Sequence, residues 1–378
     1  MNKKIKVLTA AIALVGILSV GAKSAWGAAD KNSQIDINDI IRLTTSNNSE
    51  LSVFKQKIEV RDKWYHDALE EKSKESNYQK DMRKYINPFR RQEEIKNLEW
   101  QKDQKQDEVV LSTTKAYYDI MLQNQMIELQ EKKIERLKKL LEYKKEKIKI
   151  GTEAATSLID DETNLKDAEM KLQQLKNSEE SLRMELNMKI GNPVDKKLNL
   201  KKAEIPYKPY EVKNLEAVIE KMLTKSHTIT SMIEEQKIDI KEKDILEDYE
   251  NATNASELER AANPSGDYKA RIEDLEDQLI ELKYKMDDEK KSIEAKIRMD
   301  YNSILNAKDD VQVKKLDYEK AQTLLKTEKA KFDAGRSTKI QCDAAEESVL
   351  MASCEYNRAK LNYYVAVEKF KNYNKRAL

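Results

Sequence analysis

The sequence contains few residues that interrupt helices. Only 7 glycines and 5 prolines occur among 378 residues, which is too few for a fold with many loops. It also contains few residues that build chemical sites. The two histidines, His66 and His227, lie in corresponding segments without the set of ligands that a metal site requires. There is no phosphate-binding loop, glycine-rich nucleotide motif or nucleophile elbow, so we predict neither an enzyme nor a cofactor.

The two cysteines, Cys342 and Cys354, indicate packing rather than chemistry. Twelve residues apart on one helix, they would be separated by about 18 Å, too far for an internal disulfide. Their equivalents in the repeat described below are Leu158 and Met170. We therefore interpret both thiols as small buried groups, in preference to redox or metal chemistry.

Charged residues are abundant instead. They make up 37% of the chain, and the mean hydropathy is −0.82. This composition is typical of long helices or coiled coils. A helix that buries only a narrow stripe needs few apolar residues, so we predict an elongated all-α protein. The carboxylates mostly alternate with lysines at helical spacing, as on solvated helix faces.

The main positive feature is an internal repeat with an offset of 184 residues. Each copy contains a helical hairpin that turns at a glycine, Gly151 in the first copy and Gly335 in the second. A seven-residue apolar repeat precedes each turn, which predicts antiparallel coiled-coil hairpins and would not persist in a disordered chain. The two matching series are Ile120, Ile127, Ile134, Leu141 and Ile148, and Ile304, Val311, Tyr318, Leu325 and Phe332.

The repeat divides the chain into four segments. We assign residues 1–27 to a signal peptide, 28–190 to the first repeat, 191–212 to a linker and 213–378 to the second repeat. The early helices match as well, at an offset of 180 between Gln56–Lys63 and Gln236–Lys243. The linker contains three prolines and one short candidate strand at residues 198–200. The expected helices are 37–87, 91–150, 157–190, 215–250, 268–332 and 338–374.

The N-terminus is typical of an export signal. Three lysines precede an apolar run at residues 7–21, and residues 25–27 or 27–29 fit a cleavage site with small residues. The run is short for a spanning helix, and an uncleaved anchor is the alternative. Removal of residues 1–27 changes the formal net charge from +1 to −3, which gives no basic footprint for nucleic acid. We therefore expect an exported protein of the cell envelope.

The last helix carries a stripe of alanines. Small residues recur at every seventh position, three residues after a series of larger side chains that runs from Cys342 to Phe370. Such a stripe lets a neighbouring helix approach closely. Two alternatives remain at this point, packing within the hairpin or contact between subunits. The stripe consists of Ala345, Ala352, Ala359 and Ala366.

These features together resemble the TolC family of outer membrane efflux proteins. The shared pattern is two tandem helical repeats, each with a hairpin whose turning glycine is followed by a polar–apolar pair and a heptad run with alanine. The resemblance covers about residues 35–375. The residues that carry it, beside the two turning glycines, are Ser157-Leu158 with Ala168, Gln341-Cys342 with Ala352, and Gly191 at the end of the first repeat.

The resemblance implies an architecture and a function. Three chains would join into a homotrimer whose hairpins form a hollow α-barrel, and the hairpin tips would meet a periplasmic-type adaptor protein. We therefore expect a passive conduit for efflux or secretion, working with an energised inner-membrane pump and located in the outer membrane if the cell has one. The tip residues would be Gly151, Thr156, Ser157, Leu158, Gly335, Ile340, Gln341 and Cys342.

The sequence departs from the family in two places. The family's membrane-spanning strands lie between the helices of each repeat, but residues 71–100 and 247–275 lack the apolar alternation that such strands need. Only Tyr85, Ile86 and Phe89 could enter a membrane interface, and packing of a loop is the favoured alternative. At the turns, Ser157 and Gln341 replace an aspartate that the family often has.

Three acidic residues near the turns could compensate for this replacement. In a trimer, Asp160, Asp161 and Asp343 could form an acidic ring that favours cations, although ordinary solvated charges are the favoured alternative. The rival hypothesis for the whole chain is a non-channel coiled-coil structural or interaction protein of the cell envelope. The absent strands favour this rival, whereas the paired tip motifs favour transport.

Overall fold

The computed structural model describes residues 34–70, 78–251 and 268–376, and the predicted export signal lies outside them. Most of the described residues are helical, as predicted. The first repeat contains α1 (Ile37–Asn47), α2 (Ser49–Leu69), α3 (Tyr78–Tyr85), α4 (Asn87–Lys149), the short 3-10 helix η1 (Ala155–Ser157) and α5 (Leu158–Ile190). The second repeat contains α6 (Leu215–Lys225), α7 (His227–Asn251), α9 (Tyr268–Asp333) and α10 (Lys339–Arg376).

Polar caps begin the early helices of both repeats at matching positions. The side chains of Asp36 and Asn214 each accept a hydrogen bond from the backbone N–H three residues ahead, at 2.9 and 3.1 Å. The single early helix that we predicted for each repeat is wrong, because Asn48 and Ser226 each cap a second helix in the same way. Both pairs of caps are 178 residues apart, although the sequences of these helices match at 180.

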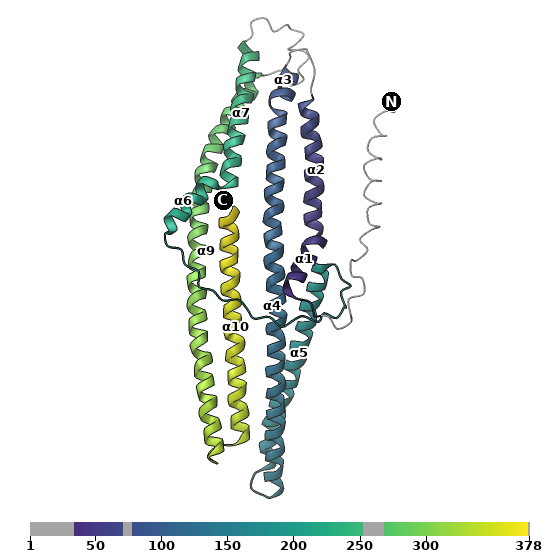
Figure 1. The fold of residues 1–378 in the computed structure, drawn as a ribbon, viewed down its shortest axis with the longest axis vertical. Helices are drawn as coiled ribbons and strands as arrows, with labels where there is room; N and C mark the ends of the chain where they lie inside the picture. The colour runs from purple at the N-terminus through teal and green to yellow at the C-terminus, as the bar shows by residue number, and fades with distance from the viewer. Residues whose placement is uncertain (1–33, 71–77, 252–267, 377–378) are drawn as a thin grey trace.

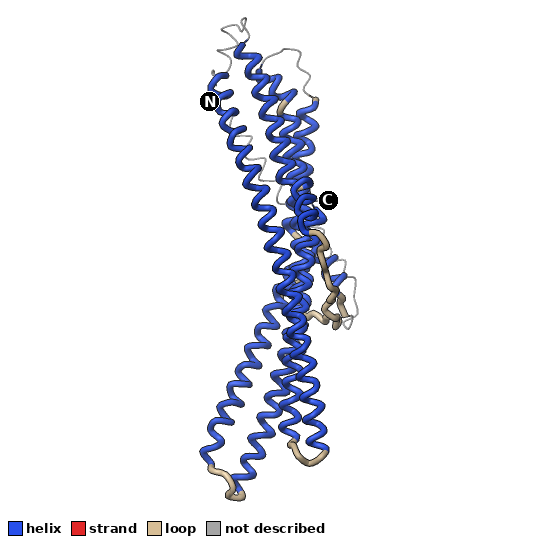
Figure 2. The backbone as a smooth tube through the Cα atoms, turned by 90° about the vertical axis from the view of Figure 1, so that its left-hand side faces the viewer, coloured by secondary structure: helices blue, strands red, loops and turns tan. Residues whose placement is uncertain are grey.

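The helices form an elongated bundle with two hairpins at one end (Figures 1 and 2). In the lower half of Figure 1, α4 packs antiparallel to α5, and α9 packs antiparallel to α10. Helix α10 also packs against α4 and so joins the two repeats. In the upper half, α2 lies beside α4, and α7 lies beside α9. The two repeats therefore use the same order of helices, and both hairpin tips point to the same end.

The core lies at mid-height, where two buried clusters fill the space between the helices. Large apolar and aromatic side chains dominate both, as expected for helices that bury a narrow stripe. One cluster belongs to the second repeat and includes Ile304, Val311, Ala359, Tyr363 and Phe370. The other belongs mainly to the first repeat and includes Ile40, Tyr117, Ile120, Leu186 and Ile190.

The predicted heptad seams face the inside of each hairpin. The buried members are Ile120, Ile134 and Leu141 in α4, with Ile304 and Val311 in α9. The half-buried members are Ile127, Ile148, Tyr318 and Leu325. Phe332 is the exception, because it is exposed on the last turn of α9, where the hairpin reverses and no facing turn covers it. The seams therefore bury their middle and loosen toward the tips.

Tyrosine hydroxyls hold the linker against the bundle at mid-height (Figure 1). Tyr117 and Tyr118 of α4 each donate a hydrogen bond to a carbonyl of the linker, the second at 3.3 Å. Tyr363 of α10 donates to a third carbonyl at 3.3 Å and accepts from the N–H of Tyr210 at 2.7 Å. Burial raises the pKa of Tyr117 to about 12, so this hydroxyl stays protonated and able to donate.

Helices account for nearly all described residues of the stretches between the early and long helices. Residues 78–85 belong to α3 and 87–100 to α4, with a turn at Ile86 between them, and residues 247–251 and 268–275 belong to α7 and α9. Within the described ranges, β-type pairing is limited to one parallel bridge between Ile35 and Leu200, so the short strand expected at residues 198–200 is reduced to a single bridge residue. No helix in those ranges is both long and apolar enough to cross a membrane.

Candidate functional site at the hairpin tips

The long helices of both repeats end in the same backbone motif. Gly151 and Gly335 have φ angles of 75° and 71°, a left-handed conformation that favours glycine. Each glycine N–H donates to the carbonyl three residues back at 2.9 Å, and the next N–H donates to the carbonyl five residues back. This pair of bonds is a Schellman motif, which ends a helix and satisfies its last carbonyls. The two predicted turning glycines are therefore confirmed as helix ends.

The first tip is a long turn that leaves several groups unsatisfied. After Gly151, the chain passes through η1 before α5 begins. Ser157 occupies the N-cap position of α5, but its side chain caps nothing and its buried hydroxyl has no hydrogen-bond partner. Two large apolar side chains flank the turn, since Ile150 is 73% exposed and Ile159 is 62% exposed. Exposed apolar groups of this size are typical of a surface that contacts a partner.

The second tip is short and satisfies its own polar groups. Thr338 accepts a hydrogen bond from the N–H of Gln341 at 3.2 Å, and the Gln341 side chain accepts from the N–H of Thr338 at 2.8 Å. This reciprocal pair is a capping box, which fixes the start of α10. Ser337 donates to Glu328 across the turn. The second tip therefore presents fewer free groups than the first.

Ion pairs cross each hairpin close to its tip. Lys145 and Glu162 approach to 3.8 Å in the first hairpin, and their equivalents Lys329 and Glu346, both 184 residues later, approach to 2.9 Å in the second. The internal repeat thus includes a matched polar contact in addition to the apolar seam. Such partly exposed pairs fix register more than they add stability.

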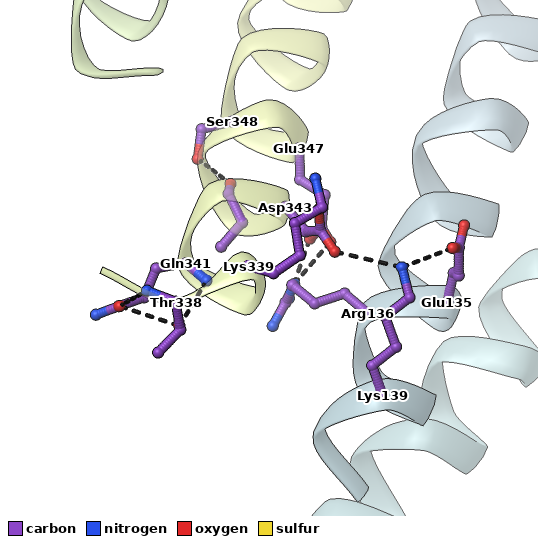
Figure 3. A network of polar contacts seen from close by, with 10 residues as sticks. Glu135, Arg136, Lys139, Thr338, Lys339, Gln341, Asp343, Glu347 and Ser348 are labelled. Atoms are coloured by element: carbon purple, nitrogen blue, oxygen red, sulfur yellow. Dashed lines mark hydrogen bonds and ion pairs between the residues drawn. The ribbon is translucent and has the colours of Figure 1, made fainter. Parts of the chain in front are cut away.

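A second set of polar contacts joins the two hairpins to each other (Figure 3). The guanidinium of Arg136 on α4 donates two hydrogen bonds, at 2.6 and 3.0 Å, to the carboxylate of Glu347 on α10. Both side chains are mostly buried, so this bidentate pair holds the hairpins together in a defined orientation. Lys139 lies 3.5 Å from Asp343, which also pairs with Lys339 at 2.9 Å.

The predicted tip residues differ in accessibility. Thr156 and Gln341 are exposed, while Ile340, Leu158 and Ser157 are half-buried. Cys342 does not line the tip surface, because its side chain is only 2% exposed and its thiol lies 3.7 Å from the carbonyl of Glu328 on α9. It occupies the seam side of α10, in agreement with the packing role inferred for both cysteines.

The three candidate acidic residues do not present three free charges in one chain. Asp161 is buried and forms an ion pair with Lys144. Burial alone would raise the pKa of Asp343, but hydrogen bonds and charge from Lys339 and Lys139 hold it below the usual range. Only Asp160 is exposed and, within the described part of the chain, without an ion pair. Asp161 and Asp343 are paired with lysines of the same chain, so of the three candidates only Asp160 offers an unpaired charge to an acidic ring.

The alanine stripe packs within the chain in its upper part. Ala359 is buried and Ala366 is half-buried, and both contact the core cluster that contains Tyr363 and Phe370. Ala345 and Ala352 are half-buried farther down the hairpin. Of the two alternatives weighed for the stripe, close packing inside the hairpin accounts for its upper part.

Two features of the site escaped the sequence reasoning. The heptad series include neither Ile150 nor Ile159, and only the turn geometry shows that both are exposed. The pair of Arg136 and Glu347 joins residues 211 positions apart, on helices whose facing sides the heptad pattern does not define. The matched ion pairs near the tips could have been found, because they keep the offset of 184.

The chain shares its fold with solved outer membrane channels, while no family model and no curated protein matches its sequence. It aligns with the outer membrane protein VceC from Vibrio cholerae at 11% identity and a TM-score of 0.60, over 90% of this chain and 95% of VceC. The Campylobacter jejuni CmeC channel gives 11% identity and a TM-score of 0.62, over 90% and 86%. The Neisseria gonorrhoeae MtrE channel gives 11% and 0.58, over 89% and 88%. These similar proteins are channels rather than enzymes, and they confirm the predicted TolC-like fold.

Proposed function

We propose that the protein is a TolC-like efflux channel of the cell envelope, a passive trimeric helical conduit for efflux or secretion. One observation carries the proposal: two long hairpins, equivalent by repeat, point to the same end in a fold shared with solved channels over about nine-tenths of the chain. A passive conduit needs a smooth wall and no catalytic group. Long parallel-sided helices of this kind supply such a wall when several copies stand side by side.

An exposed apolar stripe on α9 supports assembly with further copies. Its members lie on the face of α9 opposite the helix's buried residues, and α9 forms one edge of the chain, whereas α2 and α5 form the other (Figure 1). A contact between two different edges is heterologous and closes into a ring when the rotation allows it. Three chains would give six hairpins. The stripe consists of Ile280, Tyr284, Leu305, Val313, Leu316 and Leu324.

The first tip is the stronger candidate for contact with a periplasmic-type adaptor. Ile150 and Ile159 offer exposed apolar area that a partner could cover. Asp160 stands beside them and would supply one acidic group per chain at the mouth of a trimer, which favours cations. The adaptor would couple the conduit to an energised inner-membrane pump.

Mass and shape of the purified protein test this proposal directly. Light scattering and negative-stain microscopy, with and without detergent, should give a trimer with a central lumen. Leu316→Glu should reduce the trimer to smaller species, because it places a charge in the stripe. Lys326→Glu is the matched control, since Lys326 is exposed on α9 outside the stripe. An elongated monomer or dimer without a lumen would leave the rival, a coiled-coil structural protein.

A further inference from the structure

Exposed aromatic side chains lie on α2, α3 and the first turn of α4, and these parts of the three helices are at the end of the bundle opposite the hairpin tips (Figure 1). Trp64 on α2 is 42% exposed, Tyr85 on α3 is 39% exposed and Phe89 on α4 is 45% exposed. We call these three residues the aromatic belt. Ile86, which the sequence grouped with Tyr85 and Phe89, is fully buried and does not belong to it. The aromatic rings at this end thus come from three different helices.

Contacts with cationic side chains show that these rings lie at the same height along the long axis of the bundle. Arg61 lies 4.1 Å from the centre of the Trp64 ring, and Arg91, two residues beyond Phe89 on α4, lies 5.1 Å from it. Contacts through α4 therefore bring Trp64 and Phe89 to the same height. The three belt residues thus lie on neighbouring helices of the first repeat.

One lysine links the other two rings of the belt. The ammonium of Lys241 on α7 lies 4.5 Å from the centre of the Phe89 ring and 5.7 Å from that of Tyr85. The ammonium of Lys84 lies 4.8 Å from the centre of the Tyr85 ring. Cations over aromatic rings at this distance are held by the ring quadrupole. The level defined by Trp64 and Phe89 therefore extends to α3 and α7.

Of the four cationic side chains that contact the belt, two form ion pairs with described residues and two do not. Arg61 and Arg91 both reach Glu94, at 2.9 Å each. Lys84 and Lys241 form no ion pair with any residue that the structure describes, although the Tyr85 hydroxyl and the Asp81 carboxylate both favour the charged form of Lys84. Rings that offer apolar area beside ammonium groups without an ion pair match the boundary of a bilayer, where acyl chains meet phosphate headgroups.

We propose that the aromatic belt is a peripheral docking site for an anionic lipid surface, with Tyr85 and Phe89 entering the headgroup region and Lys84 and Lys241 contacting phosphate. The contact would be made by side chains near helix ends, and no described helix can span a membrane. Its strength would combine buried apolar area with attraction to anionic lipid, as for other interfacial anchors. This inference goes beyond the conduit, since it does not require a lumen.

Vesicle binding tests the belt. The purified full-length chain should co-sediment with vesicles of phosphatidylcholine and phosphatidylglycerol, and more weakly with phosphatidylcholine alone. The double variant Tyr85→Ser/Phe89→Ser should weaken binding by roughly tenfold or more, because each ring contributes buried apolar area. Lys84→Gln/Lys241→Gln should remove most of the difference between the two vesicle types.

A matched control exists at the opposite end of the same chain. Tyr143 on α4 is also exposed and also lies under a lysine, with Lys147 4.8 Å from its ring centre, but it stands near the first tip. Tyr143→Ser should leave vesicle binding unchanged. Equal loss in this control, or no vesicle binding by the unaltered chain, would overturn the proposal. A change of oligomer mass in the belt variant without loss of vesicle binding would assign the belt to a subunit contact instead.

Discussion

The two hairpins share one plan but differ in how completely each satisfies its own groups. Both end a long helix on a left-handed glycine, and both place a lysine–glutamate pair across the seam at the same offset. The second hairpin then closes with a capping box, while the first leaves Ser157 unpartnered and Ile150 exposed. Duplication thus preserves the elements that fold the hairpin. The groups free to contact another protein differ between the copies.

The largest effect should come from the shared part of the plan. Ile120 and Ile304 are equivalent seam positions and both are fully buried. Ile120→Ala and Ile304→Ala should each lower the free energy of unfolding by about 2–5 kcal/mol, because each leaves a cavity between packed helices. Urea unfolding monitored by circular dichroism measures both. A large loss in one hairpin and none in the other would break the equivalence of the two copies.

A somewhat smaller effect should separate the two ends of the alanine stripe. Ala359→Leu should lower the free energy of unfolding by about 1–3 kcal/mol, because Ala359 is 2% exposed and packs against the core of the second repeat. Ala345→Leu, at a half-buried position near the tip, is the control and should cost less. Thermal unfolding measured together with oligomer mass distinguishes the alternatives. Loss of assembly without loss of stability would reassign the stripe to a subunit contact.

The difference between the tips themselves can be measured with two cap variants. Thr338→Ala removes the capping box and should cost about 1 kcal/mol of stability. Ser157→Ala, at the matching end of the first hairpin, should cost close to nothing, because its hydroxyl caps nothing and is buried without a partner. Equal losses in chemical denaturation would show that the two tips do not differ as described.

The smallest expected effect is a pH dependence of the stability that arises from His227 in the second repeat. His227 begins α7, stacks on Trp100 at 4.8 Å and approaches Asn97 with its Nε2 at 2.7 Å. Burial lowers the pKa of His227, with Glu93 raising it and Lys96 lowering it to lesser extents. The unfolded chain therefore binds the proton more readily. Stability should be complete above the unfolded pKa of about 6.5 and should fall as the pH decreases through it.

His227→Gln should flatten this slope, measured as the melting temperature at several pH values. His66→Gln is the control, because His66 is exposed and lies 3.7 Å from Asp62, one helical turn away on the surface of α2. A slope that survives in the His227 variant and disappears in the His66 variant would contradict the assignment.

The sequence predicted those features that depend on local pattern. Periodicity, glycine placement and the offset of 184 gave the two hairpins, and the resemblance drawn from them gave the fold. The breaks at Asn48 and Ser226 were missed, since a polar cap inside an otherwise helical pattern looks like any surface residue. The contacts that depend on tertiary packing, above all Arg136 with Glu347 and the exposure of Ile150, could not follow from one-dimensional periodicity.

The tyrosine-held linker has a mechanical consequence. It fixes both hairpins at mid-height, near Tyr118 and Tyr363, and leaves the chain below to extend to the tips. From Tyr118 to Lys149, where α4 ends, the 32 residues of helix make an arm of about 48 Å. A rotation of only about 5° at this fulcrum carries the tip through about 4 Å, close to the width of a side chain. A small rotation of the hairpins about the linker contacts at mid-height would therefore displace the tips by several ångströms.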